Sequence, residues 1–317
     1  MTNLDQTSLS RRAVLAGAGG LTLGAAVLPS VSAHAMGHGG AHRLSRTIGV
    51  GSFEVVTLLD GARNVPEPQS IFGMNVGAEE FAAVSEENFL PVDQARFFFT
   101  PTLVNTGSEV VLFDTGNGGD NGNLPAALAD AGYAPEDVTI VVITHMHPDH
   151  IGGMMTSGAA SFPNARYVTG SAEYNFWTGG NAPEQLAGMV ANMVVPFAEQ
   201  MTFLDDGGSV TGGVTAMAAF GHTPGHMVYR IESDGQQLVL VADLANHYVW
   251  SLAYPDWEVR FDADKAAAAA ARREVLGMLA ADRIPFVGYH MPFPALGYVA
   301  ARGDGFRYVP ESYQFDL

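Results

Sequence analysis

The sequence predicts an α/β fold, and two observations support this. Past residue 50, short runs of apolar and β-branched residues alternate with Gly, Asp and Asn turns and with a few helical segments. Five of these runs are each followed by a residue able to bind metal, namely Asp114, His145, His222, Asp243 and His290. α/β proteins gather their sites at strand ends along one edge of a packed sheet, so we expect these five side chains to converge.

The elements follow in a definite order. We expect strands at 53–59, 139–143, 213–222 and 286–290, and hairpins at 101–114 and 227–243 that turn at 105–108 and 234–235. The strand at 139–143 has a continuous apolar run, which indicates burial on both faces. Asp264 is expected to start an alanine-rich helix that ends shortly before Pro285.

The N-terminal segment has the pattern of an export signal. Arg11 and Arg12 precede an apolar stretch at 13–28, which is followed by Pro29 and small residues at 31–33. This pattern predicts a twin-arginine signal at 1–33 and a protein exported to the periplasm or secreted. We expect a leader rich in Gly and His at 34–50 and a single catalytic domain at 51–317.

Composition limits the partners and the chemistry. The net charge is −18 over 317 residues, so the surface repels phosphate backbones and anionic membranes. We therefore expect a small neutral substrate, no nucleic acid and no stable membrane association after signal cleavage; a homodimer is left open. The chain has no cysteine, so any metal must be held by histidine, carboxylate or backbone oxygen.

Residues 141–153, VVITHMHPDHIGG, carry the strongest signal for metal binding. They place three of the chain's 10 histidines and an aspartate within positions 145–150. His145 and His147 are two apart, so their rings point to one side of an extended backbone. Asp149 and His150 follow Pro148, where the chain turns into a helix. Four ligands this close would crowd a single tetrahedral zinc, so the spacing favours two adjacent ions over one. The alternative is a histidine cluster satisfied by hydrogen bonds alone.

These residues carry a family resemblance. The segments THMHPDH and GHTPGH, together with Asp243 after LVLVA and His290 after FVGY, resemble the metallo-β-lactamase-fold hydrolases in order and spacing. LFDTG, HMHPDHIGG, HMPFPALG and GFRYVP resemble, within that superfamily, methyl parathion hydrolase-like enzymes and related lactonases. The resemblance covers roughly residue 51 to the C-terminus. It implies an αββα sandwich, with two mixed sheets flanked by helices.

The resemblance also implies a binuclear metal centre. His145, His147 and His222 would bind one divalent ion, Asp149, His150 and His290 the second, and Asp243 both. The ions would most readily be zinc, with manganese, cobalt or iron also accepted. A metal-bridging hydroxide would then cleave neutral apolar esters such as lactones, aryl esters or phosphotriesters like methyl parathion. Asp149 and Asp243 are thus the candidate catalytic carboxylates.

Supporting residues can also be named. Asp114 is expected to orient a ligand histidine and His226 to brace the site. Trp177, Phe99 and Phe197 are the candidate pocket aromatics, although each could equally pack in the core. Alternative functions are a β-lactamase-type hydrolase, a mononuclear-iron redox enzyme of the same fold and a non-catalytic binding protein.

Overall fold

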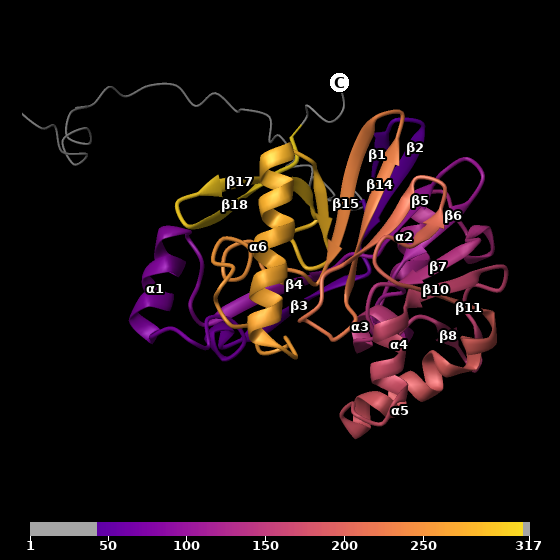
Figure 1. Cartoon of the computed structure of the whole chain (residues 1–317), viewed down its shortest axis with the longest axis horizontal. Coiled ribbons are helices and arrows are strands. Elements are labelled where there is room, and N and C mark those ends of the chain that lie inside the picture. The colour runs from indigo at the N-terminus through magenta and orange to yellow at the C-terminus, as the bar shows by residue number, and fades with distance from the viewer. Residues whose placement is uncertain (1–42, 313–317) are drawn as a thin grey trace, which may run out of the picture. The chain divides into compact units, whose positions relative to one another are not determined.

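The computed structural model describes residues 43–312, all of which belong to one compact unit. Two seven-stranded mixed sheets form its centre (Figure 1). The first sheet has the order β1 (Ser45–Val50), β2 (Phe53–Leu58), β5 (Thr102–Asn105), β6 (Val110–Phe113), β7 (Ile140–Ile143), β10 (Arg166–Gly170) and β11 (Met201–Leu204). The second has the order β12 (Ser209–Thr211), β13 (Val214–Ala218), β14 (Met227–Ser233), β15 (Gln236–Ala242), β16 (Phe286–Gly288), β17 (Leu296–Arg302) and β18 (Gly305–Pro310).

Helices cover the sheets, and two small strand pairs complete the fold. The α-helices are α1 (Ala78–Glu87), α2 (Leu124–Asp130), α3 (Pro148–Ile151), α4 (Ser171–Thr178), α5 (Glu184–Met193) and α6 (Lys265–Asp282). Short 3₁₀ helices span Pro68–Ser70, Gly119–Asn121, Pro135–Asp137 and Val195–Gln200. The pairs are β3 (Gly61–Pro66) with β4 (Gln94–Phe99), and β8 (Met155–Thr156) with β9 (Ala159–Ala160). None of the helices in the described part is long and apolar enough to cross a membrane.

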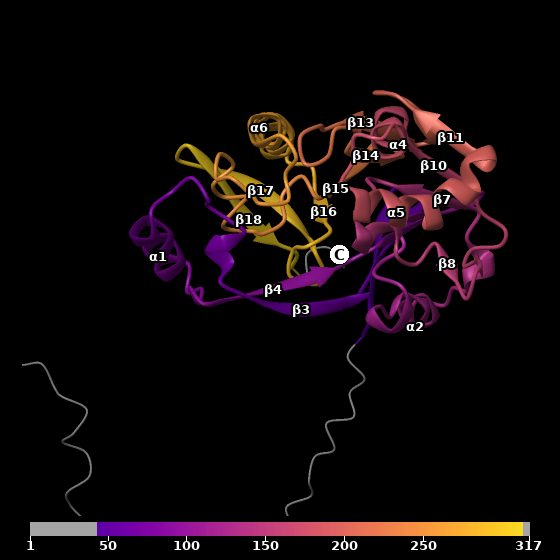
Figure 2. The ribbon, with the colours of Figure 1, turned by 90° about the horizontal axis from the view of Figure 1, so that it is seen from below.

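The core has the layers that the resemblance implies. Buried residues of the two sheets form one apolar cluster, and α6 packs on the second sheet, where it contacts β17. The other face of the first sheet packs against α2, α4 and α5 in a second cluster. The arrangement is therefore an αββα sandwich, as predicted. Figure 2 shows the β3–β4 pair extending beneath the two sheets, and it carries one wall of the site described below.

The folded unit starts earlier than expected. Strand β1 pairs with β2 from Ser45 to Val50, a segment that we assigned to the leader. Ile48 and Val50 are buried in the core between the sheets, and Gly51 adopts the positive φ that the turn into β2 requires. The predicted signal at 1–33 lies outside the described residues. The expected hairpins at 101–114 and 227–243 are both present, and the Asp264 side chain caps α6 by accepting the Ala267 N–H.

A third, aromatic cluster includes Phe97 and Phe99 of β4. His247 packs against two members of this cluster, Phe72 and Trp250. Its buried ring stacks on Trp250 with centroids 4.1 Å apart, and its Nδ1 accepts the N–H groups of Val249 and Trp250, each at 3.1 Å. Burial lowers the pKa of His247 to about 3. The ring is therefore neutral in the folded chain over most of the acid range.

This pKa predicts a pH-dependent stability. The unfolded chain binds a proton at residue 247 below about pH 6.5 and the folded chain does not, so stability falls as the pH drops from 6.5 toward 3. When the pH is lowered from 7.5 to 5.0, we expect the free energy of unfolding of the wild type to decrease by about 2 kcal/mol more than that of His247→Gln. Urea unfolding at the two pH values checks this. An identical loss in both proteins would contradict a neutral buried ring.

Candidate metal centre

The five strand ends named from the sequence meet at one edge shared by the two sheets. Asp114 and His145 follow β6 and β7 of the first sheet, and Asp243 and His290 follow β15 and β16 of the second. His222 lies beyond β13. The backbone at Gly153 lies close to the loop after β6, because a Cβ on Gly153 would lie 2.1 Å from the Thr115 carbonyl oxygen.

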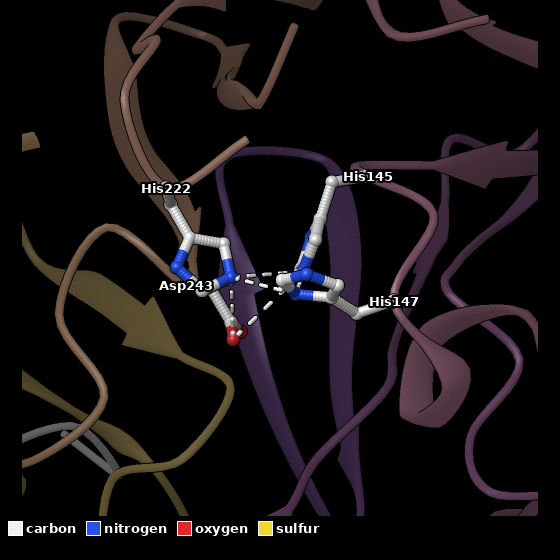
Figure 3. A group of neighbouring side chains, drawn as sticks. All are labelled: His145, His147, His222 and Asp243. Carbon is white, nitrogen blue, oxygen red and sulfur yellow. Dashed lines mark hydrogen bonds and ion pairs between the residues drawn. The ribbon is translucent and has the colours of Figure 1, made fainter. Parts of the chain in front are cut away.

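His145, His147 and His222 form the first group of candidate ligands, and Figure 3 shows their rings facing one another beside Asp243. His147 Nδ1 lies 3.1 Å from His145 Nε2 and 3.0 Å from His222 Nε2, and the two Nε2 atoms are 3.2 Å apart. Three neutral rings cannot satisfy three such contacts with hydrogen bonds alone. The ligand atoms around a tetrahedral zinc are about 3.3 Å apart. The spacing therefore fits a bound cation.

Asp149, His150 and His290 form the second group. Asp149 Oδ2 lies 3.4 Å from His290 Nε2 and 3.7 Å from His150 Nε2. Asp149 stands at the start of α3 and is the most exposed of the three, whereas both histidines are buried. The second group thus opens toward solvent through its carboxylate.

The Asp243 carboxylate lies between the two groups. Its Oδ2 is 3.3 Å from His222 Nε2 and 3.1 Å from His290 Nε2, and its Oδ1 is 3.2 Å from His150 Nε2. Each carboxylate oxygen therefore has its own histidine neighbours. This arrangement fits a carboxylate shared by two cations, as the resemblance implies.

Two further features fit a bound metal. His150 Nε2 and Asp243 Oδ1 are buried 3.2 Å apart, and neither atom makes a well-directed hydrogen bond with any described residue. Burial lowers the pKa of His145 well below its ordinary value, and burial together with His222 lowers that of His147 to about 3. Both rings are thus neutral and able to coordinate. The donor set of histidine and carboxylate without cysteine suits a divalent ion.

Asp243 stays ionised within this buried cluster. Burial raises the pKa of Asp243, but the positive charges of His290 and His150 outweigh burial and hold it well below its ordinary value. The buried carboxylate therefore requires positive charge beside it. Protons on the two histidines supply that charge in the free chain, and divalent cations would supply it in the loaded one.

Hydrogen bonds at the far nitrogen orient four of the five candidate ligand histidines. Asp114 accepts from His150 Nδ1 at 2.8 Å, in the orienting role expected of it. The backbone carbonyl of Phe98 lies 2.8 Å from His290 Nδ1, and the Thr144 hydroxyl lies 3.1 Å from His145 Nδ1. Asp262, which we did not select from the sequence, accepts from His222 Nδ1 at 3.0 Å. Each contact leaves Nε2 directed into the site.

His226 braces Asp243 and does not join the candidate ligands. Its Nε2 accepts the backbone N–H of Asp243 at 3.1 Å, and its Nδ1 lies 3.1 Å from the carbonyl oxygen of Ala219. Burial, reinforced by His222, lowers the pKa of His226 to about 3, which keeps Nε2 free to accept. This geometry agrees with the bracing role expected of it.

Glu173, which we also did not select, joins the two loops that carry the first group. Its carboxylate is fully buried and accepts from Met146 N at 2.9 Å and from Thr223 Oγ1 at 2.6 Å. It also accepts from Gly225 N at 3.0 Å and Trp177 Nε1 at 2.6 Å. A Cβ on Gly225 would lie 2.0 Å from Glu173 N, so only glycine allows this approach.

Of the three aromatic residues predicted to line the pocket, only Phe99 lines the cavity beside the site. Phe99 lines a cavity of about 1100 Å³ that also reaches His147, Asp149, Asp243 and His290. Phe197 is buried in the outer core, with its ring centroid 4.2 Å from that of Tyr167. Trp177 lies beside His147 at 5.8 Å, but its N–H is bound to Glu173 and the residue is 4% exposed. Trp177 and Phe197 are therefore core residues on helical segments and do not line the cavity.

Asp60, another residue not selected, holds a wall of the cavity. Its buried carboxylate accepts N–H groups of Asn117, Asn123 and Leu124 at 2.8–2.9 Å. These bonds fix the loop that brings Asn117 and Asn121 to the cavity. Four carboxylates that belong to no ligand group thus support the site from behind, namely Asp114 and the three not selected from the sequence, Asp60, Glu173 and Asp262.

An αββα sandwich with a histidine and carboxylate centre at the edge of both sheets is the arrangement of a metal-dependent hydrolase. The model of the metallo-beta-lactamase superfamily matches residues 100–286, and the chain belongs to this superfamily.

Solved structures and curated proteins agree with this assignment. The dizinc quorum-quenching lactonase AidC, solved with the product N-hexanoyl-L-homoserine, is 30% identical, with a TM-score of 0.79 over 86% of this chain and 99% of that chain. An N-acyl homoserine lactonase from Bacillus cereus is 31% identical over 114 residues, 36% of this chain and 41% of the relative. Metallo-beta-lactamase domain-containing protein 1 from Mus musculus is 57% identical over 44 residues, 14% of this chain and 17% of the relative. These two matches span less than half of each curated relative.

We expect Glu173→Gln to weaken metal retention. In the wild type both carboxylate oxygens of Glu173 accept hydrogen bonds, whereas the glutamine amide would place an NH₂ group opposite some of these donors. The loops at 144–150 and 221–226 would therefore lose some of the hydrogen bonds that join them. Zinc affinity should fall about 10- to 100-fold, measured by competition with a chromogenic chelator. Glu199→Gln, an exposed residue in the 3₁₀ helix that follows α5, is the matched control. Wild-type affinity in Glu173→Gln would exclude the proposed link.

Proposed function

We propose that the chain is a binuclear metallohydrolase that cleaves cyclic or acyclic esters, with lactones as the preferred class. The position of Asp243 supports the binuclear centre most directly, because its carboxylate lies within 3.1–3.3 Å of histidines from both groups, His222 of the first and His150 and His290 of the second. The likeness to AidC over most of both chains supports the lactonase preference. Aryl esters and phosphotriesters are cleaved by the same class of reaction, metal-dependent hydrolysis, so the proposal includes them as further substrates.

The reaction adds one water across the ester. A new C–O bond forms between water oxygen and the carbonyl carbon, the ester C–O bond breaks, and the products are an acid and an alcohol. Two divalent ions in such a site supply an activated water and stabilise the charge that develops on the carbonyl oxygen. We propose that the seven ligands are His145, His147, His222, Asp149, His150, His290 and Asp243, with zinc as the preferred ion.

The residues around the centre would position and shield the reaction. The cavity reaches Asp149, whose side chain is partly exposed, so a substrate in the cavity would lie beside this carboxylate. Asp149 is placed to receive a proton from the attacking water or return it to the leaving alcohol, because its carboxylate lines the cavity. Tyr289 donates to the Asp149 backbone carbonyl at 2.5 Å and packs on His150 with centroids 4.0 Å apart. These contacts fix the start of α3 and with it the position of the carboxylate.

Metal analysis and a substrate panel test this proposal. We expect close to two ions per chain, and the highest kcat/KM on N-hexanoyl-homoserine lactone among that lactone, p-nitrophenyl acetate, methyl paraoxon and nitrocefin. Asp243→Asn should lose at least about 10³-fold on every substrate, because a shared ligand is removed. Asp120→Asn, which lines the cavity but belongs to neither ligand group, is the matched control. One iron per chain would favour the redox alternative, and a clear preference for nitrocefin would favour the β-lactamase alternative.

We also propose that the chain is exported through the predicted signal at 1–33. The support is the pair Arg11 and Arg12 ahead of an apolar stretch and small residues. The protein should be found in the periplasmic fraction or the medium of its host, and replacing both arginines by lysine should retain it inside the cell. Equal distribution of the wild-type and variant proteins would refute this route.

A further inference from the structure

His290 is flanked by two phenylalanine rings of one strand. Phe97 and Phe99 lie two residues apart on β4, so their side chains point to the same face. Their ring centroids are 5.4 Å and 5.5 Å from that of His290, with interplanar angles of 78° and 80°. The Phe98 carbonyl between them lies 2.8 Å from His290 Nδ1. Strand β4 therefore holds His290 and also forms the adjoining cavity wall.

An arginine stands at each end of this aromatic wall. The guanidinium of Arg63, on the paired strand β3, lies over the ring of Phe99 at 5.6 Å. Phe261 meets Phe97 edge-on at 6.3 Å, and the guanidinium of Arg260 lies over the ring of Phe261 at 5.1 Å. The aromatic arc, as we name this set, is Arg63, Phe99, His290, Phe97, Phe261 and Arg260, and all six line the same cavity.

Neither guanidinium has a carboxylate partner among the described residues, although the chain carries many more acids than bases. Arg272, Arg273 and Arg302, by contrast, each pair with a carboxylate. The acidic groups on the cavity wall are Asp120, Asp149 and Asp243, and the last two belong to the ligand groups. A guanidinium held over an aromatic ring keeps its N–H edge free, and that edge matches a carboxylate with two parallel hydrogen bonds.

We propose that Arg63 provides an anion subsite, with Arg260 as a second guanidinium at the other end of the arc, and that the preferred ester substrate carries a carboxylate beyond its scissile bond. This inference rests on the proposed hydrolase. The two ring contacts place Arg63 Cζ within about 11 Å of the His290 ring, a span that one aromatic ester covers. The apolar body of the substrate lies along Phe97 and Phe99, and its carboxylate reaches a guanidinium. The substrate is thus an anionic ester or lactone, in place of the neutral one expected from the acidic surface.

A matched pair of substrates tests the subsite in the zinc-loaded enzyme. The pair is 4-acetoxybenzoate and its neutral methyl ester, methyl 4-acetoxybenzoate, with each kcat/KM divided by the uncatalysed rate. We expect the wild type to favour the anion about tenfold, and the double variant Arg63→Met/Arg260→Met to bring the ratio close to one. Methionine keeps most of the length of the side chain and removes the charge. Added salt should lower the wild-type ratio and leave that of the double variant unchanged.

Arg96→Met is the matched control. Arg96 lies on the same strand pair, over the ring of Phe98 at 5.6 Å, but it donates to Asn64 and does not line the cavity. Its substitution should leave the anion-to-neutral ratio unchanged. A wild-type ratio of one or below, or the same ratio in the wild type and the double variant, would overturn the subsite.

A binding measurement separates this inference from the proposed function. The amides 4-acetamidobenzoate and methyl 4-acetamidobenzoate carry the same charge difference, and their affinities are measured by calorimetry on the zinc-loaded protein. If no ester is hydrolysed, the proposed function fails, yet the subsite still predicts about tenfold tighter binding of the anionic amide. Equal affinity of both amides would refute the subsite even in an active hydrolase.

Discussion

The structure depends on ring nitrogens that converge with their lone pairs facing one another. His145, His147 and His222 place three nitrogens 3.0–3.2 Å apart, an arrangement that neutral rings do not hold by themselves. A bound cation would resolve this conflict, and the surrounding fold must hold the rings in place before it binds. Hydrogen bonds at the far nitrogens of His145, His150, His222 and His290 supply that hold. Their partners come from β4 and from loops at 114, 144 and 262 that are distant in sequence. The metal centre is therefore a property of the whole sandwich.

The supporting carboxylates divide this task. Asp114 holds a histidine of the second group, Asp262 holds one of the first, and Glu173 joins the two loops that carry the first group. Asp262 is itself fixed by the buried guanidinium of Arg272 at 2.8 Å, so one charge network runs from α6 to His222. Burial raises the pKa of Glu173, and the donors that surround it favour its ionised form. Burying a carboxylate costs free energy even when four donors surround it. Glu173 is retained because it joins the two loops that carry the first group.

The sequence was informative where one local pattern determined both structure and chemistry. Continuous apolar runs defined the strands, and the polar residue after each run identified His145, Asp243 and His290, because a sheet brings strand ends to one edge. Glu173, Asp262 and Asp60 carried no such signal, since an acid on a helix or in a turn is ordinary. Their function comes from contacts that are distant in sequence. The prediction that Trp177 on α4 and Phe197 on the following 3₁₀ helix line the pocket was wrong for a related reason. An aromatic residue on a helix can pack in a core or line a pocket, and the packing between segments determines which of the two occurs.

The chemistry and the substrate selectivity of this fold are set by different parts of the chain. The candidate ligands follow strands of the two large sheets, whereas the cavity wall is built from β3, β4, α5 and the segment at 260–261. Changes in that wall would alter the substrate and leave the reaction class intact. Phe97 and Phe99 are exceptions, because the same two rings flank His290 and form the cavity surface. At these positions a change in selectivity also disturbs a candidate metal ligand, so variation in substrate should concentrate on Arg63, Arg260 and Phe261 at the ends of the arc.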